Sequence, residues 1–145
     1  MIGLIQRVSE ANVTVAGEVI GEINKGMLVL LGVEKEDGEA EIEKLTSKLC
    51  RYRMFSDEDG KMNLNIDQVG GEILVVSQFT LVADTQKGNR PGFSRGASPE
   101  HGKAIYEKFV QSLKNKGMKV ATGEFGADMQ VGLINDGPVT FQFSV

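Results

Sequence analysis

The chain has 145 residues, of which 41% are hydrophobic and 25% charged, and its formal net charge at pH 7 is −4. These values predict a single globular domain over residues 1–145, because a chain of this length buries about two thirds of its surface without needing disulfides. The negative charge argues against a broad nucleic-acid-binding face, although it leaves room for a local basic patch. The first residues form neither a signal peptide nor a membrane span, so we expect a cytoplasmic protein with no membrane partner.

The first part of the chain is predicted to consist of strands followed by one helix. Residues 2–8 and 13–15 alternate loosely before a turn at Gly17, which predicts a hairpin. The continuous apolar run at 25–33 predicts a strand that is covered on both faces. Asp37 is expected to cap the helix that follows. The apolar stripe of this helix comprises Ile42, Leu45, Leu49 and Tyr52.

The second part begins with a short strand at 63–66 and a buried strand at 75–84. A glycine-rich basic loop at 85–97 leads to a second helix, with Ser98 as N-cap and Pro99 at its first position. Gly117 is expected to end this helix. Its apolar stripe comprises Ile105, Phe109 and Leu113. Three short strands are predicted at 119–122, 129–134 and 139–145.

This order of elements predicts a mixed α/β (α+β) fold. Strands outnumber helices by about three to one, so we expect two packed β-sheets, or one curled barrel-like sheet, with both helices on one outer face.

The chain contains a single cysteine and a single histidine, Cys50 and His101. They are too few for an internal disulfide or a zinc site, and we expect no metal and no cofactor. Cys50 lies beside the apolar helical stripe and is interpreted as an inert packed thiol rather than as a nucleophile. His101 falls in the first turn of the second helix and is interpreted as a surface or capping residue.

Three polar residues, Ser77, Gln78 and Thr80, interrupt the apolar strand at 75–84. The hydroxyls could simply bond the ends of neighbouring strands. Alternatively, the strand bends or bulges there, so that its N–H groups leave the ladder and point at a ligand carbonyl. Thr80 could also be a nucleophile, although a threonine without a neighbouring base is a weak one. Because nothing fixes His101 near these residues, a Ser-His-Asp triad is not expected.

A second interruption occurs near the C-terminus. Asn135, Asp136 and Gly137 have the composition of a hairpin turn, but Pro138 cannot donate a hydrogen bond to a strand ladder. A Gly-Pro bond also admits the cis form more readily than other peptide bonds. An ordinary turn and an unusual backbone shape both fit these residues.

Several sequence blocks resemble the D-aminoacyl-tRNA deacylase family. They are SQFTL at 77–81, NRPGFSRGASP at 89–99 and NDGPVT at 135–140, together with LIQRV, ANVTV, GMLVLLGVEKED and RMFSDEDGKMNLN nearer the N-terminus. The resemblance covers essentially the whole chain. It implies a homodimeric hydrolase with the fold of these deacylases, which cleaves the ester joining a D-amino acid, or glycine, to the terminal adenosine of tRNA. Such an enzyme proofreads aminoacyl-tRNA in translation.

The same resemblance implies the roles of individual residues. It assigns the reaction centre to Ser77, Gln78, Phe79 and Thr80. It assigns chiral selection to a cis pair, Gly137 and Pro138, which reaches across the dimer interface into the partner's pocket.

Further residues are matched to the substrate pocket. Phe125 and Met129 resemble pocket walls, although both also suit a hydrophobic core. Gly102 resembles a small residue that leaves space for the terminal adenosine, at a position where alanine is expected in the family. Arg7 either orients the Gly-Pro carbonyls or is an exposed strand charge.

The residues also suggest a mechanism. Without a protein base, water attack is expected to be assisted by the 2′-hydroxyl of the terminal ribose. The N–H of Phe79, with that of Thr80, would stabilise the oxyanion. Thr80 as nucleophile is the less favoured mechanism.

A local basic excess is predicted to serve the tRNA acceptor end. It is supplied over residues 86–103 by Lys87, Arg90, Arg95 and Lys103 against Glu100. These cations either contact phosphates near the CCA end or belong to a solvated loop and helix face. DNA is not expected as a partner. Two alternative functions remain: a non-catalytic module that binds the tRNA acceptor end, and a general esterase.

Overall fold

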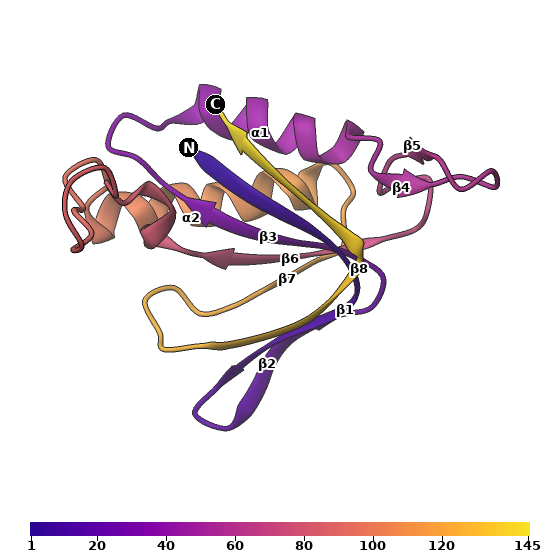
Figure 1. Ribbon diagram of the computed structural model, residues 1–145, viewed down its shortest axis with the longest axis horizontal. Helices are drawn as coiled ribbons and strands as arrows, with labels where there is room; N and C mark the ends of the chain where they lie inside the picture. The colour runs from indigo at the N-terminus through magenta and orange to yellow at the C-terminus, as the bar shows by residue number, and fades with distance from the viewer.

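The computed structural model describes all 145 residues. Figure 1 shows a curled sheet with both helices on one of its faces. In chain order the elements are β1 (Ile2–Val15), β2 (Glu18–Ile23), β3 (Gly26–Gly32), α1 (Glu39–Arg51), β4 (Phe55–Ser56), β5 (Met62–Leu64), β6 (Glu72–Ser77), the 3₁₀-helix η1 (Phe79–Val82), α2 (Pro99–Asn115), β7 (Val120–Thr122) and β8 (Gln130–Ser144).

The long strand β1 organises the main sheet. The strand order is β2-β1-β3-β6-β7, and β8 also pairs with β1. The pairs of β1 with β2, β3 and β8 are antiparallel, whereas β3 with β6 and β6 with β7 are parallel. The sheet is therefore mixed, and a separate two-stranded sheet of β4 and β5 lies beside it.

Apolar residues fill both faces of the sheet. The helices cover one face, where Leu45 of α1 and Phe109 of α2 are buried against side chains such as Val29. On the other face, Leu28 and Val76 belong to a second buried cluster, against which residues from β8 pack. The run at 25–33 is thus covered on both sides, as its sequence predicts.

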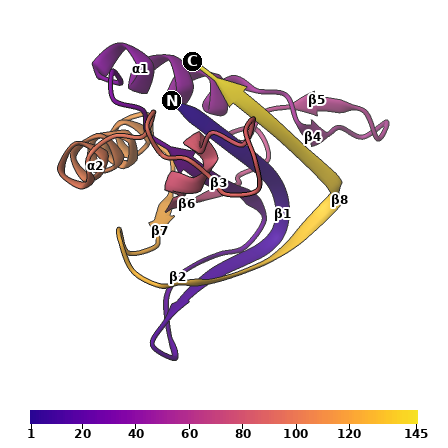
Figure 2. The same ribbon diagram turned by 60° about the vertical axis from the view of Figure 1, so that its left-hand side comes forward.

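The sheet curls far enough to bring β2 towards β7. The backbone at Gly21 approaches the carbonyl oxygen of Thr122 so closely that a Cβ atom would collide with it. Figure 2 shows the lower strands curving away from the helices. The prediction of a curled barrel-like sheet with two helices on one outer face is therefore confirmed.

The start of α1 differs from the prediction. Gly38 is the N-cap, and its N–H donates to the Glu41 carboxylate at 2.9 Å. Asp37 is not the cap because its carboxylate accepts hydrogen bonds from the Met1 ammonium at 2.9 Å and from the Glu34 N–H at 2.7 Å. A local capping rule misses a partner that lies far away in the sequence.

The second helix follows the prediction closely. Ser98 caps α2, with its hydroxyl oxygen accepting the His101 N–H at 3.2 Å, and Pro99 is the first helical residue. Gly117 follows the end of the helix with a φ of +87°, in the left-handed region that favours glycine. Neither helix is both long enough and apolar enough to cross a membrane.

Several strand boundaries were predicted wrongly. Residues 2–8 and 13–15 belong to the single strand β1. Strand β3 pairs with its first half and β2 with its second half, and β8 pairs along nearly its whole length. The strand expected at 63–66 is β5 (Met62–Leu64), which pairs with the unpredicted β4. The two strands expected at 129–134 and 139–145 are one strand, β8.

Candidate active site

The strand predicted at 75–84 ends at Ser77. Gln78 makes a last hydrogen bond to the neighbouring strand, from its N–H to the Leu31 carbonyl oxygen at 2.8 Å. The chain then turns into η1, whose Leu81 and Val82 pack over the end of β3 at Gly32. The prediction of a continuous strand is wrong here because the apolar residues after Gln78 pack as a helical turn.

The turn leaves two N–H groups outside the regular hydrogen bonding of η1. The first bond of η1 runs from the Leu81 N–H to the Gln78 carbonyl oxygen at 3.3 Å. The N–H groups of Phe79 and Thr80 precede it. The Gln78 side-chain amide donates to the Thr80 hydroxyl oxygen at 3.0 Å, which holds these two side chains together.

A cavity of about 710 Å³ opens next to this turn. Its walls come from the end of β6, η1, the start of α2 and the loop that leads into β8. Seven residues that the sequence assigns to the reaction centre or pocket line it: Ser77, Gln78, Phe79, Thr80, Gly102, Phe125 and Met129.

The cavity wall at Gly102 leaves space for a methyl group. A Cβ atom at Gly102 would lie 3.5 Å from the ζ carbon of Phe125 and 3.9 Å from the Ala97 Cβ. An alanine would therefore fit without displacing its neighbours.

Phe125 and Met129 are both cavity walls and core residues. Phe125 packs against the helix-side core, with its ring centroid 5.9 Å from that of Tyr106. Met129 packs against the opposite core cluster. The two interpretations of these residues are compatible, because one side of each ring or chain contacts the core and the other faces the cavity.

The buried Tyr106 holds the strand that leads into the cavity. Its hydroxyl donates to the Val75 carbonyl oxygen at 3.0 Å, two residues before Ser77. Burial raises the pKa of Tyr106 to about 12. The phenol therefore stays protonated and keeps donating at any physiological pH.

The Thr80 hydroxyl is hydrogen-bonded to Gln78 and to no general base, although the Asp128 carboxylate lines the same cavity. The Nε2 of His101 lies 2.9 Å from the Asp37 carbonyl oxygen, and His101 does not line the cavity. A carbonyl can only accept, so Nε2 carries the proton. Cys50 lies on α1 outside the cavity, and burial raises its pKa, which disfavours the thiolate.

Residues 136–139 form a bulge within β8, which is the unusual backbone shape that the sequence left open beside an ordinary turn. Asn135 pairs with Val8 and Thr140 with Gln6, so residues 136–139 stand opposite the single residue Arg7. The Asn135 side chain closes the bulge, because its oxygen accepts the Val139 N–H at 2.6 Å and its nitrogen donates to the Thr140 hydroxyl at 2.9 Å. An ordinary hairpin turn is ruled out because β1 is long enough to pair with β8 on both sides of the bulge.

The bulge presents Gly137 and Pro138 at the surface. Both residues are exposed, and the peptide bond between them is cis. Gly137 has a φ of +142°, which L residues rarely adopt.

Arg7 holds the base of the bulge. Its Nε donates to the Asp136 carbonyl oxygen and its Nη1 to the Met54 carbonyl oxygen, both at 2.9 Å. The residue is only 9% exposed, so the interpretation of Arg7 as an exposed strand charge is wrong.

Within one chain the bulge and the cavity do not meet. Arg7 pairs with Met27 at the start of β3, whereas Ser77 pairs with Leu31 at its end. These ends are about 13 Å apart along the strand. In Figure 1 the arrowheads of β3 and β6 point to the left, and β8 bends at the right.

A match with known proteins identifies the family. The model described as D-Tyr-tRNA(Tyr) deacylase matches residues 4–144. The chain belongs to this family. The sequence-based assignment to the deacylase family, and with it to the hydrolases, is therefore confirmed.

Close relatives of the chain carry the same description. It is 88% identical to a D-aminoacyl-tRNA deacylase of Alteromonas mediterranea over 145 residues, which cover 100% of both chains. It is 59% identical to a D-aminoacyl-tRNA deacylase of Escherichia coli, again with 100% of both covered.

Two solved structures share the deacylase fold. The c-Myc DNA unwinding element binding protein has a TM-score of 0.94 and 40% identity, with 100% of this chain and 99% of that one covered. A probable eukaryotic D-amino acid tRNA deacylase has a TM-score of 0.87, with 99% and 98% covered. At 15% identity, the second likeness concerns the fold alone.

The cavity is also lined by residues that the sequence did not suggest. Asp128 and Val131 line it, as do Ser98 and Pro99 at the start of α2. Ser98 and Pro99 were identified only as helix-start residues, and their position in the RPGFSRGASP block was the available signal. Lys87, Arg90 and Arg95 do not line the cavity but are exposed on the loop that joins η1 to α2.

Proposed function

We propose that this deacylase-family protein hydrolyses the ester between a D-amino acid and the 3′-terminal adenosine of tRNA, releasing the free amino acid and tRNA. Residues 1–145 act as one catalytic domain, in a cytoplasmic homodimer. The observation that carries the proposal is the cavity in which the turn at residues 77–80 faces Gly102, Phe125 and Met129. It is large enough for an aminoacyl group with part of its nucleoside.

The chemistry relies on main-chain donors rather than on an activated side chain. Water attacks the ester carbonyl, the bond to the ribose oxygen breaks, and the ribose oxygen takes up the proton that the water loses. The 2′-hydroxyl of the substrate assists this transfer, because the Thr80 hydroxyl is hydrogen-bonded to Gln78 rather than to a base and His101 is bonded to a carbonyl elsewhere. The N–H groups of Phe79 and Thr80 stabilise the oxyanion, a type of contact whose loss costs about 3 to 4 kcal/mol.

Selection between mirror-image substrates comes from the bulge of a second copy. Gly137 and Pro138 of one subunit enter the cavity of the other and occupy the space where an L side chain would lie. Support comes from the exposure of both residues and from the bonds that Arg7 and Asn135 make to their neighbours. A wall of fixed backbone excludes a side chain more strictly than mobile side chains would.

Glycine escapes this exclusion. It has no side chain to collide with the wall, so mischarged glycyl-tRNA is also a substrate. A D side chain points away from the wall, which explains tolerance of many D-amino acids.

The loop at residues 85–97 contacts the phosphates near the CCA end of the tRNA. Lys87 and Arg90 are exposed there, and the Arg95 side chain makes one long hydrogen bond, to the Ala83 carbonyl oxygen at 3.4 Å. Binding through such contacts weakens as salt concentration rises and depends little on tRNA identity.

Release of tyrosine from charged tRNA tests the proposal. We expect the purified protein to release D-tyrosine from D-tyrosyl-tRNA and to leave L-tyrosyl-tRNA intact. Binding of tRNA without release would instead identify a non-catalytic acceptor-end module. Hydrolysis of simple activated esters at the same rate as D-tyrosyl-tRNA would identify a general esterase.

A further inference from the structure

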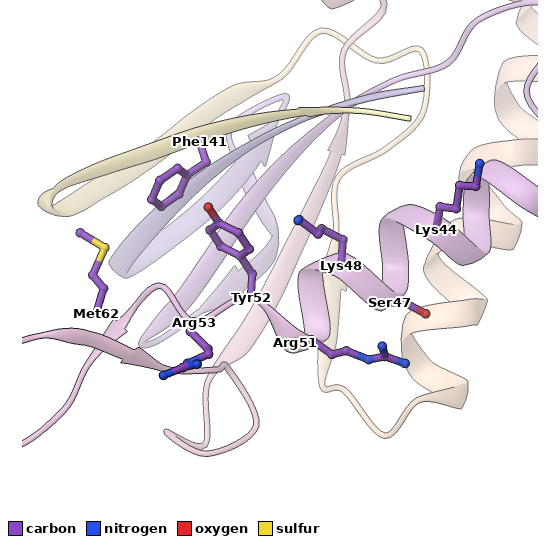
Figure 3. A pocket seen from close by; sticks show the side chains of 8 residues that line it. All are labelled: Lys44, Ser47, Lys48, Arg51, Tyr52, Arg53, Met62 and Phe141. Carbon is purple, nitrogen blue, oxygen red and sulfur yellow. The ribbon is translucent and has the colours of Figure 1, made fainter.

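A second cavity, of about 730 Å³, lies between α1, the β4–β5 segment and the last part of β8, and we call it the α1 groove. Figure 3 shows the side chains that line it. They are Lys44, Ser47, Lys48, Arg51, Tyr52, Arg53, Met62 and Phe141. Four of these eight residues are basic and none is acidic, on a chain whose net charge is −4.

Three of the cations have no carboxylate partner. Lys44, Lys48 and Arg51 form no ion pair, and their spacing of four and three residues brings them together along α1. The nearby Glu43 is already bonded to Lys116 and Ser47. No ion pair within the chain therefore neutralises these three charges.

Aromatic rings form part of the groove wall. The Tyr52 ring lies edge-on to Phe141, with centroids 5.1 Å apart, and the Lys48 ammonium lies 5.2 Å from the Tyr52 centroid. In Figure 3 the Tyr52 ring stands between Phe141 and Lys48. Cations beside partly exposed rings suit a nucleic-acid strand, in which phosphates alternate with flat bases.

The groove adjoins the bulge that carries Gly137 and Pro138. Arg53 lines the groove, and the next residue, Met54, accepts a hydrogen bond from Arg7, which also holds Asp136. Phe141 lies three residues after Pro138 on the same strand. A bulge that enters the cavity of a second copy would carry the groove to the edge of that cavity.

We propose that the α1 groove binds the phosphate backbone of the tRNA whose aminoacylated end occupies the cavity of the second copy. The inference rests on the proposed function, in which the bulge reaches across the dimer. One subunit then supplies the selector and an electrostatic contact, and the other subunit supplies the reaction centre.

Charge removal in the groove tests this inference. The triple variant Lys44→Gln, Lys48→Gln, Arg51→Gln is compared with Lys25→Gln, Lys108→Gln, Lys114→Gln, which removes the same charge from exposed positions outside the groove. Binding of uncharged tRNA is measured at several salt concentrations, together with hydrolysis of a D-tyrosyl ester of adenosine. The subunit mass of each variant is measured in parallel.

We expect the groove variant to lose about tenfold or more in tRNA affinity and to lower the slope of log affinity against log salt by about 2 to 3, since each phosphate contact contributes about 0.7 to 0.9. Hydrolysis of the adenosine ester should stay at the wild-type rate, and the control should bind tRNA nearly as the wild type does.

Unchanged tRNA affinity in the groove variant would overturn the inference, as would an equal loss in the control. The groove variant could also fail to dimerise while its remaining dimers bind tRNA as tightly as the wild type does. That result would overturn the inference and identify the groove as a subunit interface. Failure of the wild type to hydrolyse any D-aminoacyl ester would refute the proposed function instead, because the binding comparison does not depend on turnover.

Discussion

The Nε of Arg7 donates to the main-chain oxygen of Asp136 at 2.9 Å, and this bond ties β1 to the residue that immediately precedes Gly137. The other end of the guanidinium donates to the Met54 carbonyl oxygen. Because Arg7 is almost buried, the bulge is fixed from inside the protein rather than by a mobile surface side chain.

Replacement of Arg7 should loosen chiral selection. In Arg7→Met the Asp136 and Met54 carbonyls lose their donors, and we expect unfolding free energy to fall by about 1 to 3 kcal/mol. With the selector less firmly held, release of L-tyrosine from L-tyrosyl-tRNA should rise relative to release of D-tyrosine. Urea unfolding and both release rates check this. Arg53→Met, which removes another arginine bonded to a main-chain carbonyl, is the control for the loss of stability alone, because Arg53 lines the α1 groove. An unchanged D/L ratio in Arg7→Met would contradict the role of Arg7.

Gly137 should not tolerate a side chain. A Cβ atom there would lie 2.7 Å from the Val139 Cγ2 and 3.0 Å from the Val139 nitrogen, at a φ of +142°. Gly137→Ala should therefore distort the bulge and lower D-tyrosine release about tenfold or alter its selectivity. Gly70→Ala is a matched control, because Gly70 also has a positive φ but would meet nothing within 4 Å, so only about 1 to 2 kcal/mol of backbone strain is expected. Wild-type kinetics in Gly137→Ala would show that the shape of the bulge is irrelevant to the reaction.

The sequence predicted well what depends on local chemistry. Ser98 and Pro99 start α2 because a hydroxyl cap and a fixed φ act within one helical turn, and the run at 25–33 is covered on both faces. Periodicity and element count also sufficed for the curled sheet with helices on one side. The family was recognisable because uncommon blocks occur in the same order along the chain.

Long-range partners decided what the sequence could not predict. Asp37 has the chemistry of a helix cap but is taken by the Met1 ammonium. The residues at 135–138 have turn composition, yet β1 pairs on both sides of them and makes a bulge. The α1 groove was also missed, since Lys44, Lys48 and Arg51 have the ordinary appearance of an exposed helix face until Phe141 is brought beside them.

Removal of the Thr80 hydroxyl should leave most of the activity. Its oxygen accepts a hydrogen bond from Gln78 and is bonded to no base, so Thr80→Ala should reduce single-turnover D-tyrosine release by less than about tenfold. Thr80→Ser, which keeps the hydroxyl, is the control. Complete loss of turnover in Thr80→Ala, together with an acyl group trapped on Thr80 in the wild type, would establish Thr80 as the nucleophile.

Tyr106 should make stability depend on pH in the alkaline range. The folded-state pKa of Tyr106 is about 12 and lies above the ordinary value of 10.0. The contribution of Tyr106 to the free energy of unfolding is therefore fully present below pH 10 and is lost as the pH rises from 10 through 12. At pH 8 we expect Tyr106→Phe to be about 1 kcal/mol less stable, because the Val75 carbonyl loses a donor. Urea unfolding of both proteins from pH 8 to 11.5 should show this difference shrinking. A difference that stays constant with pH would contradict the assigned burial of the phenol.

The central claim, that the working site combines the cavity of one subunit with the bulge of another, is tested most directly by complementation. Gly102→Trp fills the cavity, and Pro138→Trp places an indole where the selector enters it, so each variant alone should be inactive on D-tyrosyl-tRNA. When the two are co-expressed and assort at random, half of the dimers carry one intact site, and activity should return to about a quarter of the wild-type rate. Full activity of Pro138→Trp alone, or no recovery in dimers shown by mass to be mixed, would contradict the shared site.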